Sequence, residues 1–308
     1  MVYTKFSQFE ELVRAHPVRR RMAIAVAGDE HTLEAALHAR RQGICDPIPV
    51  GDAAEIRRIL ARLGETIPAE DIHDAPDPKA ACDYAVALAR EGRADFVMKG
   101  NIDTSVVLRS VVNKETGLGV GKMMTLFTMH QVSGYHKLIA PVDGGMVTYP
   151  TLEQKKGIIE STVSVMRSLG WEKPKVGVLC AVEKVNPKMP ETLDADALRQ
   201  MYLRGEITDC ILEGPISYDC AVSREIAEFK GLHSEIAGDV DVLLVPNIHV
   251  GNVIGKIYTT TCGGMMAGFV TGGRCPVVVA SRGATPDEKY YSVVVASAAA
   301  SAAAQKNA

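Results

Sequence analysis

The segment Ser281-Arg282-Gly283 directly follows an apolar run and offers a hydroxyl and a guanidinium side by side. The guanidinium fork of Arg282 matches phosphate oxygens bidentately and remains charged at neutral pH. Asp287 and Glu288 follow within one further helical turn, and a carboxylate can act as a general base. This combination and spacing predict an anion-binding site with a proton acceptor beside it.

Each of these side chains also has a purely structural interpretation. Thr285 lies three residues before Glu288, and this spacing is typical of a capping box at a helix start. Arg282 can be a surface residue at the end of a strand, and Ser281 can be a helix N-cap. The residues alone leave these alternatives open.

A second candidate group follows Val240–Val245, a continuous apolar run that stops at Pro246. We expect Gly251 and Asn252 to open the next helix, because Asn suits an N-cap and a helix N-terminus attracts anions. Lys256 comes one turn later. It either faces the same site as Asn252 or is solvated.

A third group follows the apolar run at residues 95–100. Lys99 and Asn101 stand at the end of this run, before a helical segment. In open α/β sheets, ligands bind at the edge formed by the carboxyl ends of the strands. Both residues are therefore in a position suited to an anion.

The elements that must position these groups alternate between strand-like apolar runs and amphipathic helices that end at Gly. The predicted strands are 22–28, 47–52, 95–100, 175–182, 209–214, 240–246 and 276–282. Such repeated units imply an α/β fold whose parallel sheet carries helices on both faces. Two further runs flank Ser133-Gly134 and predict an antiparallel hairpin, and the Ala-rich tail predicts a docked helix.

The composition narrows the functional class. A chain of 308 residues can hold one large or two ordinary domains, and its net charge of -3 gives no reason to expect nucleic acid or an anionic membrane as partner. The seven cysteines form no CxxC pair, which indicates reduced thiols. No signal core and no run of about 18 apolar residues occurs. We therefore expect a cytoplasmic protein.

Six motifs occur in order along nearly the whole chain. They are DPIPVGD (46–52), MKGNIDTSVVLR (98–109), TLEQKKGIIE (151–160), KVNPKMPETLDADAL (184–198), LEGPISYDCAVS (212–223) and a final stretch from Pro246 through Gly251, Asn252 and Lys256 to PVVVASRG. Together they resemble the phosphate acetyltransferase and phosphate butyryltransferase family, and the fourth and fifth look closer to the butyryl branch. Asn247 stands where the family usually has Asp.

The resemblance implies two three-layer αβα domains with a cleft between them, similar to the isocitrate and isopropylmalate dehydrogenases. The first domain would be discontinuous and combine residues 1–124 with 275–308. The second would be inserted at residues 125–274. We also expect a homodimer or a higher homo-oligomer.

The resemblance further implies an acyltransferase that converts acyl-CoA and phosphate into acyl phosphate and CoA by direct transfer in a ternary complex. Butyryl is the expected acyl group and acetyl the alternative. CoA is a substrate, and we expect no metal and no permanently bound cofactor. A metal- and nicotinamide-dependent dehydrogenase is less favoured, because neither paired aspartates at ligand spacing nor GxGxxG occurs. A catalytically inactive CoA-binding subunit is a third alternative.

The same resemblance distributes the roles. Arg282 and Ser281 would hold phosphate, and Asp287 or Glu288 would take the thiol proton. The residues expected to bind CoA or phosphate are Lys99, Asn101, Thr104, Arg109, Asn252, Lys256 and Gly283. Arg109 can equally be a solvated helix arginine. Met189, Met265 and Met266 are candidate walls of an acyl pocket, with ordinary core packing as the alternative.

Overall fold

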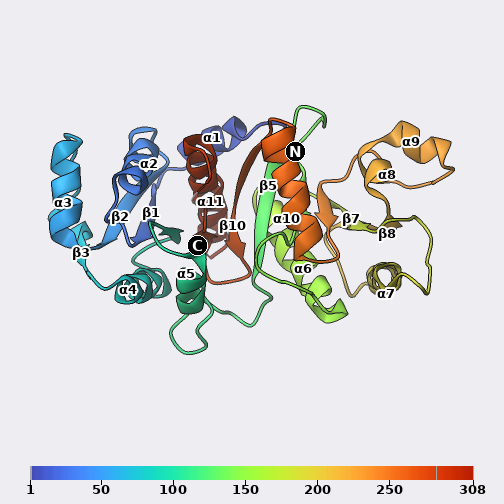
Figure 1. Cartoon of the computed structure of the whole chain (residues 1–308), viewed down its shortest axis with the longest axis horizontal. Helices are drawn as coiled ribbons and strands as arrows, with labels where there is room; N and C mark the ends of the chain where they lie inside the picture. Colours follow the sequence, from blue (N-terminus) through green and yellow to red (C-terminus); the bar gives the residue numbers. More distant parts are fainter. Residues whose placement is uncertain (1, 282, 308) are drawn as a thin grey trace. The chain divides into compact units, whose positions relative to one another are not determined.

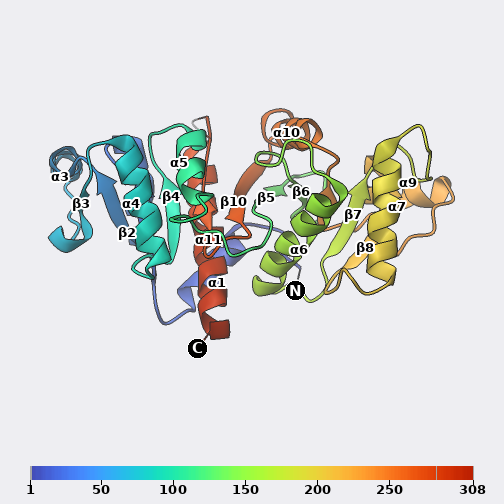
Figure 2. The same ribbon diagram turned by 90° about the horizontal axis from the view of Figure 1, so that it is seen from below.

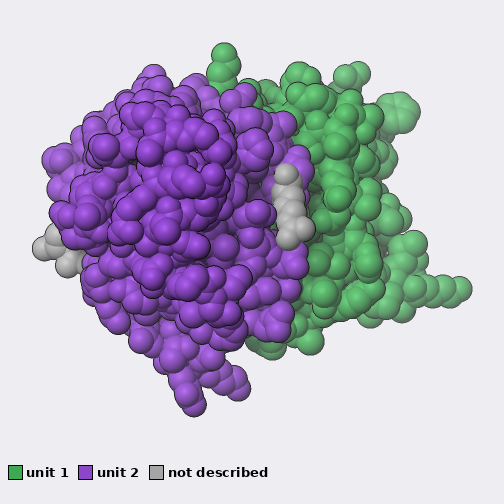
Figure 3. Space-filling view, turned by 60° about the vertical axis from the view of Figure 1, so that its left-hand side comes forward, with its two compact units in different colours: residues 1–5, 123–266 green, residues 6–122, 267–308 purple. Residues whose placement is uncertain are grey.

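The computed structural model describes residues 2–281 and 283–307. The chain divides into two compact units, which Figure 3 distinguishes by colour. Unit 1 contains residues 1–5 and 123–266, and unit 2 contains residues 6–122 and 267–308. Unit 2 is therefore built from two separate stretches of the chain.

Unit 2 holds a predominantly parallel sheet. Its strands follow the order β3-β2-β1-β4-β11-β10, and only the β10–β11 pair is antiparallel. The strands are β1 Arg20–Ala25, β2 Cys45–Gly51, β3 His73–Asp74, β4 Phe96–Lys99, β10 Met265–Thr271 and β11 Val277–Val278. The helices are α1 Ser7–Arg14, α2 Glu30–Arg41, α3 Ala53–Arg62, α4 Pro78–Arg90, α5 Thr104–Val111 and α11 Pro286–Asn307, with a 3-10 turn at Ala69–Asp71.

Helices cover both faces of this sheet. Helix α4 packs on β1, β2 and β4 and against α5, while α11 packs against α1 and α2 and on β11. Figure 1 shows α4 and α5 on the side of the sheet opposite α2 and α11. The predicted docked C-terminal helix is confirmed, because the side chains of Val293, Val294 and Val295 in α11 are fully buried.

Local sequence signals set the ends of the helices in unit 2. Asp29, Asp52 and Asp77 each accept a hydrogen bond from the first turn of the following helix. A glycine with positive φ follows α2, α3 and α4 within two residues of the last helical residue, as at Gly43 with φ of 76°. The left-handed conformation favours Gly there, so the predicted helix ends are confirmed.

Unit 1 is built on a second, four-stranded sheet with the order β6-β9-β7-β8, in which all neighbours are parallel. The strands of this sheet are β6 Ala140–Val142, β7 Lys175–Leu179, β8 Ile211–Ile216 and β9 Val242–Leu244, and unit 1 also contains β5 Thr125–Gln131, which is not part of it. Its helices are α6 Leu152–Ser168, α7 Pro190–Leu203, α8 Tyr218–Val222, α9 Arg224–Phe229 and α10 Ile248–Lys256, followed by a π-helix at Ile257–Thr261. Figure 2 shows α6 and α7 on the same side of this sheet.

The predicted hairpin around Ser133-Gly134 forms only in part. One antiparallel bridge joins His130 to Ile139, but β6 then pairs in parallel with β9. The parallel pairing buries β6 completely. Burial in the four-stranded sheet therefore overrides the local turn signal.

Most predicted strands are present but shorter than their apolar runs. The run at 276–282 yields only Val277–Val278, and the run at 240–246 yields Val242–Leu244. Apolar runs continue past the last strand residue into buried positions, as at Val245, which follows β9. Among the described residues, no helix has the length and apolar content needed to cross a membrane.

Candidate functional site

The carboxyl ends of three neighbouring strands form one edge of the unit 2 sheet. Strand β4 pairs in parallel with β1 on one side and with β11 on the other, with Met98 opposite both Ile24 and Val278. The residues that follow these strands therefore share an edge, as expected for the two predicted groups at Lys99 and Ser281. We call Val26, Lys99–Thr104, Ser281 and Gly283–Glu288 the polar edge.

Lys99 anchors the loop that leaves β4. Its side chain is buried, and its ammonium donates to the carbonyl oxygens of Gly100 at 3.2 Å and Ile102 at 3.0 Å. Asn101 in the same loop is exposed. The ammonium thus places positive charge inside the loop, while the amide of Asn101 faces solvent.

Gly100 and Val26 show the close packing of this edge, which sequence reasoning missed. A Cβ at Gly100 would lie 2.1 Å from the carbonyl oxygen of Val26, so no other residue fits without backbone movement. Val26 itself has φ of 62°, a strained conformation for a β-branched residue. Such strain is concentrated at functional sites, and the sequence carries no sign of it.

Helix α5 begins at Thr104, so Lys99 and Asn101 stand before the helix, as predicted. They belong to the loop fixed by the lysine ammonium. Arg109 lies in the last turn and is exposed, and its Nε donates to the carbonyl oxygen of Ser105 at 3.2 Å. Thr104 is partly buried at the helix start.

The segment after β11 combines a tight turn with a capped helix. The backbone N–H of Gly283 donates to Ser281 Oγ at 3.3 Å, and both residues are exposed. Arg282 lies outside the described residues. The predicted capping box is confirmed, because Thr285 N–H donates to Glu288 Oε2 at 2.9 Å and Glu288 N–H donates to Thr285 Oγ1 at 3.2 Å.

The two candidate bases consequently differ in their surroundings. Glu288 is only 9% exposed and has one carboxylate oxygen committed to the cap. Asp287, one residue earlier in the same turn, is exposed. Both stand in the first turn of α11, where the helix dipole favours a negative charge.

In unit 1, helix α10 begins earlier than expected. Asn247 is the N-cap, and its side-chain oxygen accepts from His249 N–H at 3.1 Å and Val250 N–H at 3.2 Å. The prediction that Gly251 and Asn252 open the helix was therefore wrong. An amide oxygen caps as well as a carboxylate oxygen, which accounts for Asn247 at the position where the family usually has Asp.

Asn252 and Lys256 lie one turn apart on α10, and both are exposed. The amide of Asn252 donates to the carbonyl oxygen of Gly144 at 3.2 Å. Residues four apart on a helix share a face. The expectation that these two side chains are neighbours is thus met within α10.

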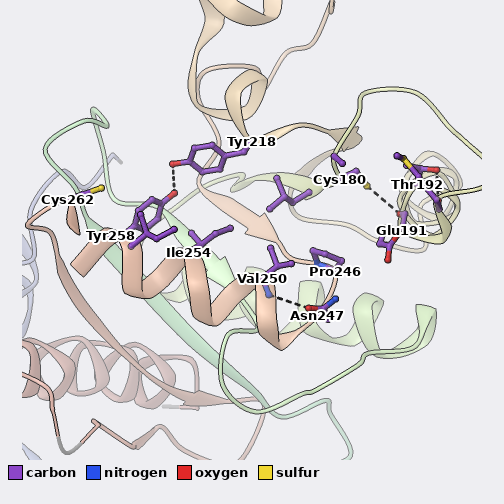
Figure 4. Close-up of a pocket in the computed structure, with 14 residues that line it drawn as sticks. Cys180, Glu191, Thr192, Tyr218, Pro246, Asn247, Val250, Ile254, Tyr258 and Cys262 are labelled. Carbon is purple, nitrogen blue, oxygen red and sulfur yellow. Dashed lines mark hydrogen bonds between the residues drawn. The ribbon is translucent and has the colours of Figure 1, made fainter. Parts of the chain in front are cut away.

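Unit 1 also contains a cavity of about 760 Å³ that the sequence did not reveal (Figure 4). Its walls come from the ends of β7 and β9, one face of α10, the start of α7, and Tyr218 of α8. Of the three methionines predicted as pocket walls, only Met189 lines it. We call this space the unit 1 cavity.

One cluster in unit 1 has the donor types of a metal site. Ligand atoms of Glu183, Asp219 and Cys220 lie within 4.8 Å of one another. The ammonium of Lys230 lies 2.9 Å from Glu183 Oε1 and 2.9 Å from Asp219 Oδ2. Hydrogen bonds from Ser217 and then Lys230 lower the pKa of each carboxyl to about 2. A lysine thus supplies the cation in this cluster.

Comparison with known proteins places these features in a family. A family model described as phosphate acetyl/butaryl transferase matches residues 78–297. Phosphate butyryltransferase of Clostridium acetobutylicum is 42% identical over 270 residues, which are 88% of this chain and 90% of that protein. Phosphate acetyltransferase of Thermotoga maritima is 37% identical over 271 residues, which are 88% and 92% of the two chains.

Comparison with solved structures agrees with this family. A branched-chain phosphotransacylase from Enterococcus faecalis V583 has a TM-score of 0.79 at 26% identity, covering 91% of this chain and 99% of that one. A 4-hydroxythreonine-4-phosphate dehydrogenase from Klebsiella pneumoniae, at 13% identity, covers 92% and 100% with a TM-score of 0.55, a likeness of fold alone. The dehydrogenase-like α/β fold is therefore confirmed, and the chain belongs to the phosphate acetyl/butyryl transferase family.

Proposed function

We propose that this protein exchanges CoA and phosphate on a short acyl group, converting acyl-CoA and phosphate into acyl phosphate and CoA. The observation that carries the proposal is the polar edge, which gathers a buried ammonium, a hydroxyl turn and two acids at neighbouring strand ends. Relatives over 30% identical along most of the chain are named for this reaction. Butyryl is the proposed acyl group, as in the relative from Clostridium acetobutylicum, with acetyl as the alternative.

The reaction requires the protein to bind phosphate, to exchange a proton with the CoA thiol and to stabilise charge on the carbonyl oxygen. A phosphate oxygen forms a bond to the thioester carbonyl carbon, and the carbon–sulfur bond then breaks to release CoA as a thiolate. In the reverse direction the CoA thiol must lose its proton before it attacks, since the thiolate is the nucleophile. The carbonyl oxygen gains charge in both directions and requires hydrogen-bond donors.

The residues of the polar edge suit these requirements. Arg282 would clamp phosphate, and the hydroxyl of Ser281 and the backbone at Gly283 would complete its binding. The carboxylate of Asp287 or Glu288 would exchange the proton with the CoA thiol. Lys99, Asn101 and Thr104 would contribute donors from the neighbouring strand end.

We assign further anion binding to three exposed side chains that can donate hydrogen bonds. Arg109 of α5 and Asn252 and Lys256 of α10 are exposed and would bind the phosphates of CoA or the transferred phosphate. Acyl transfer would proceed directly between the two bound substrates. Neither a metal nor a permanently bound cofactor is part of this mechanism, and we propose a homodimer or higher homo-oligomer as the working form.

The test is CoA release from acetyl-, propionyl-, butyryl- and hexanoyl-CoA, measured with a thiol reagent with and without phosphate. The proposal predicts release that depends on phosphate and acyl phosphate in equal amount. Release at the same rate without phosphate would indicate a thioesterase. Absence of release from every substrate would contradict the proposed function.

A further inference from the structure

The unit 1 cavity is bounded by apolar side chains from elements far apart in the chain. Val250 and Ile254 stand one turn apart on α10 and line the cavity from one side (Figure 4). Leu179 and Ala181, at the end of β7, and Met189, before α7, line other parts. The cavity thus has a core-like lining while remaining large enough for a ligand.

The polar groups on its walls are already engaged within the protein. The hydroxyls of Tyr218 and Tyr258 are 2.8 Å apart and bond to each other. Thr192 Oγ1 donates to the carbonyl oxygens of Met189 and Asn186 at 2.8 and 3.1 Å. The Asn247 side-chain oxygen caps α10. These groups have little left to offer a polar ligand.

Charge on the walls argues in the same direction. None of the residues that the structure describes as lining the cavity is Lys or Arg, and Glu191 is the single residue with a carboxyl group among them. A phosphate or pyrophosphate would meet no cation there and would face a carboxylate. An uncharged aliphatic group meets mostly apolar walls and itself loses no hydrogen bonds on entry.

The volume of the unit 1 cavity leaves room for acyl chains longer than butyryl. At about 30 Å³ for each atom the size of a water molecule, a butyryl group fills roughly 150 Å³. The cavity of about 760 Å³ exceeds this several-fold. Chains longer than butyryl, or branched chains, would therefore also fit without repacking.

We propose that the unit 1 cavity is the acyl pocket, that it accepts aliphatic acyl groups beyond butyryl in length, and that Val250 and Ile254 form the apolar wall that contacts the acyl chain. The proposal rests on the proposed function, because it takes acyl-CoA as the ligand. It goes further in naming the pocket and the residues that contact the chain.

The test separates binding from turnover. Isothermal titration calorimetry with acetyl-, butyryl- and hexanoyl-CoA, without phosphate, measures the gain in affinity per added methylene. Burial of one methylene corresponds to about fourfold in affinity. We expect this gain in the unsubstituted protein and a smaller gain in Ile254→Phe, whose larger side chain narrows the cavity beside α10, with unchanged affinity for acetyl-CoA.

The matched control lies on the same helix. Val253 is 55% exposed and does not line the cavity, so Val253→Phe should keep the full gain per methylene. Ile254→Ala removes apolar wall at the same position and should also lower the gain per methylene. Circular dichroism and thermal melting verify that each variant folds. If Ile254→Phe does not fold, Ile254→Ala still provides the test.

Three results would overturn the proposal. The first is the same chain-length profile for Ile254→Phe and Val253→Phe. The second is an equal loss of affinity for free CoA in Ile254→Phe, which would assign the cavity to the pantetheine arm. The third is a gain per methylene in Ile254→Ala that equals that of the unsubstituted protein. Failure of CoA release on adding phosphate would contradict the proposed function alone, since the affinity profile is read without turnover.

Discussion

The polar edge of unit 2 and the cavity of unit 1 lie at the carboxyl ends of parallel strands, yet they are chemically opposite. The polar edge is formed by backbone turns, an ammonium bound to carbonyl oxygens and a capped helix start. The cavity is formed by apolar side chains whose few polar neighbours bond to each other. On our proposals the two units have separate roles, in which unit 2 would carry the proton and phosphate chemistry and unit 1 would select the acyl chain.

The largest expected effect concerns the two acids of α11. Glu288→Gln should preserve the capping box, because Gln serves as well as Glu at this position, while removing the basicity. If Glu288 is the proton acceptor, kcat falls by about 10²–10⁴-fold with little change in thermal stability. Asp287→Asn is the matched variant, and the same loss there would instead identify Asp287 as the base.

The pH profile distinguishes a base from a positioning residue. Raising the pH supplies more CoA thiolate from solution, so it should partly restore the reverse reaction in the variant that lacks the base. Glu288→Ala removes the cap as well and should lower the free energy of unfolding by about 0.5–2 kcal/mol. Full activity in both Asp287→Asn and Glu288→Gln would remove the carboxylates from the mechanism.

A smaller but still large effect is expected for Arg282→Lys. Lys keeps the positive charge but loses the planar fork, so kcat should fall by about tenfold to a thousandfold. The ratio of kcat/KM for butyryl-CoA and acetyl-CoA should stay constant, because the substitution affects phosphate only. Arg274→Lys, at an exposed arginine of unit 2, is the control, and equal kinetics in both variants would place Arg282 outside the site.

Sequence reasoning reached the polar edge but not the cavity, for physical reasons. The capping box at Thr285 and Glu288 is a signal within one turn, so it could be read directly. Asn247 and Asn252 are equally good N-caps by residue type, and only the end of β9 decides between them. The cavity depends on how side chains from β7, α7 and α10 pack, which no local pattern contains.

A further prediction concerns the support behind the cavity. His130 is 1% exposed, its ring lies 5.3 Å from that of Tyr258 in a T-shaped arrangement, and neither of its ring nitrogens has a hydrogen-bond partner among the described residues. Burial lowers the pKa of His130 to about 4. Above about pH 6.5 the imidazole is neutral in both the folded and the unfolded chain, so its burial carries no penalty for a charge.

As the pH falls from about 6.5 to 4, the unfolded chain takes up a proton that the folded chain does not. Stability is therefore lost in this range, by roughly 3 kcal/mol for a shift of this size. His130→Met should lose correspondingly less between pH 7 and 4, as measured by urea unfolding at each pH. His31→Met, at a highly exposed side chain, should match the unsubstituted protein, and equal acid sensitivity in both variants would contradict the assignment.

The smallest effect is expected for metal removal. Phosphate-dependent turnover should be unchanged by EDTA, because Lys230 already supplies the cation at the cluster of Glu183 and Asp219. Loss of activity after chelation, restored by Mg²⁺ or Zn²⁺, would contradict the metal-free mechanism. If Lys230→Met lowers the free energy of unfolding and leaves turnover unchanged, the ion pair is structural.

The separation of roles between the two units is tested most directly by one quantity, the ratio of kcat/KM for butyryl-CoA to kcat/KM for acetyl-CoA. It is measured side by side in the unsubstituted protein, Arg282→Lys and Ile254→Phe. Our account predicts equal ratios for the first two, despite the large loss of rate in Arg282→Lys, and a lower ratio for Ile254→Phe, whose larger side chain narrows the cavity. A ratio that changes in Arg282→Lys but not in Ile254→Phe would contradict it.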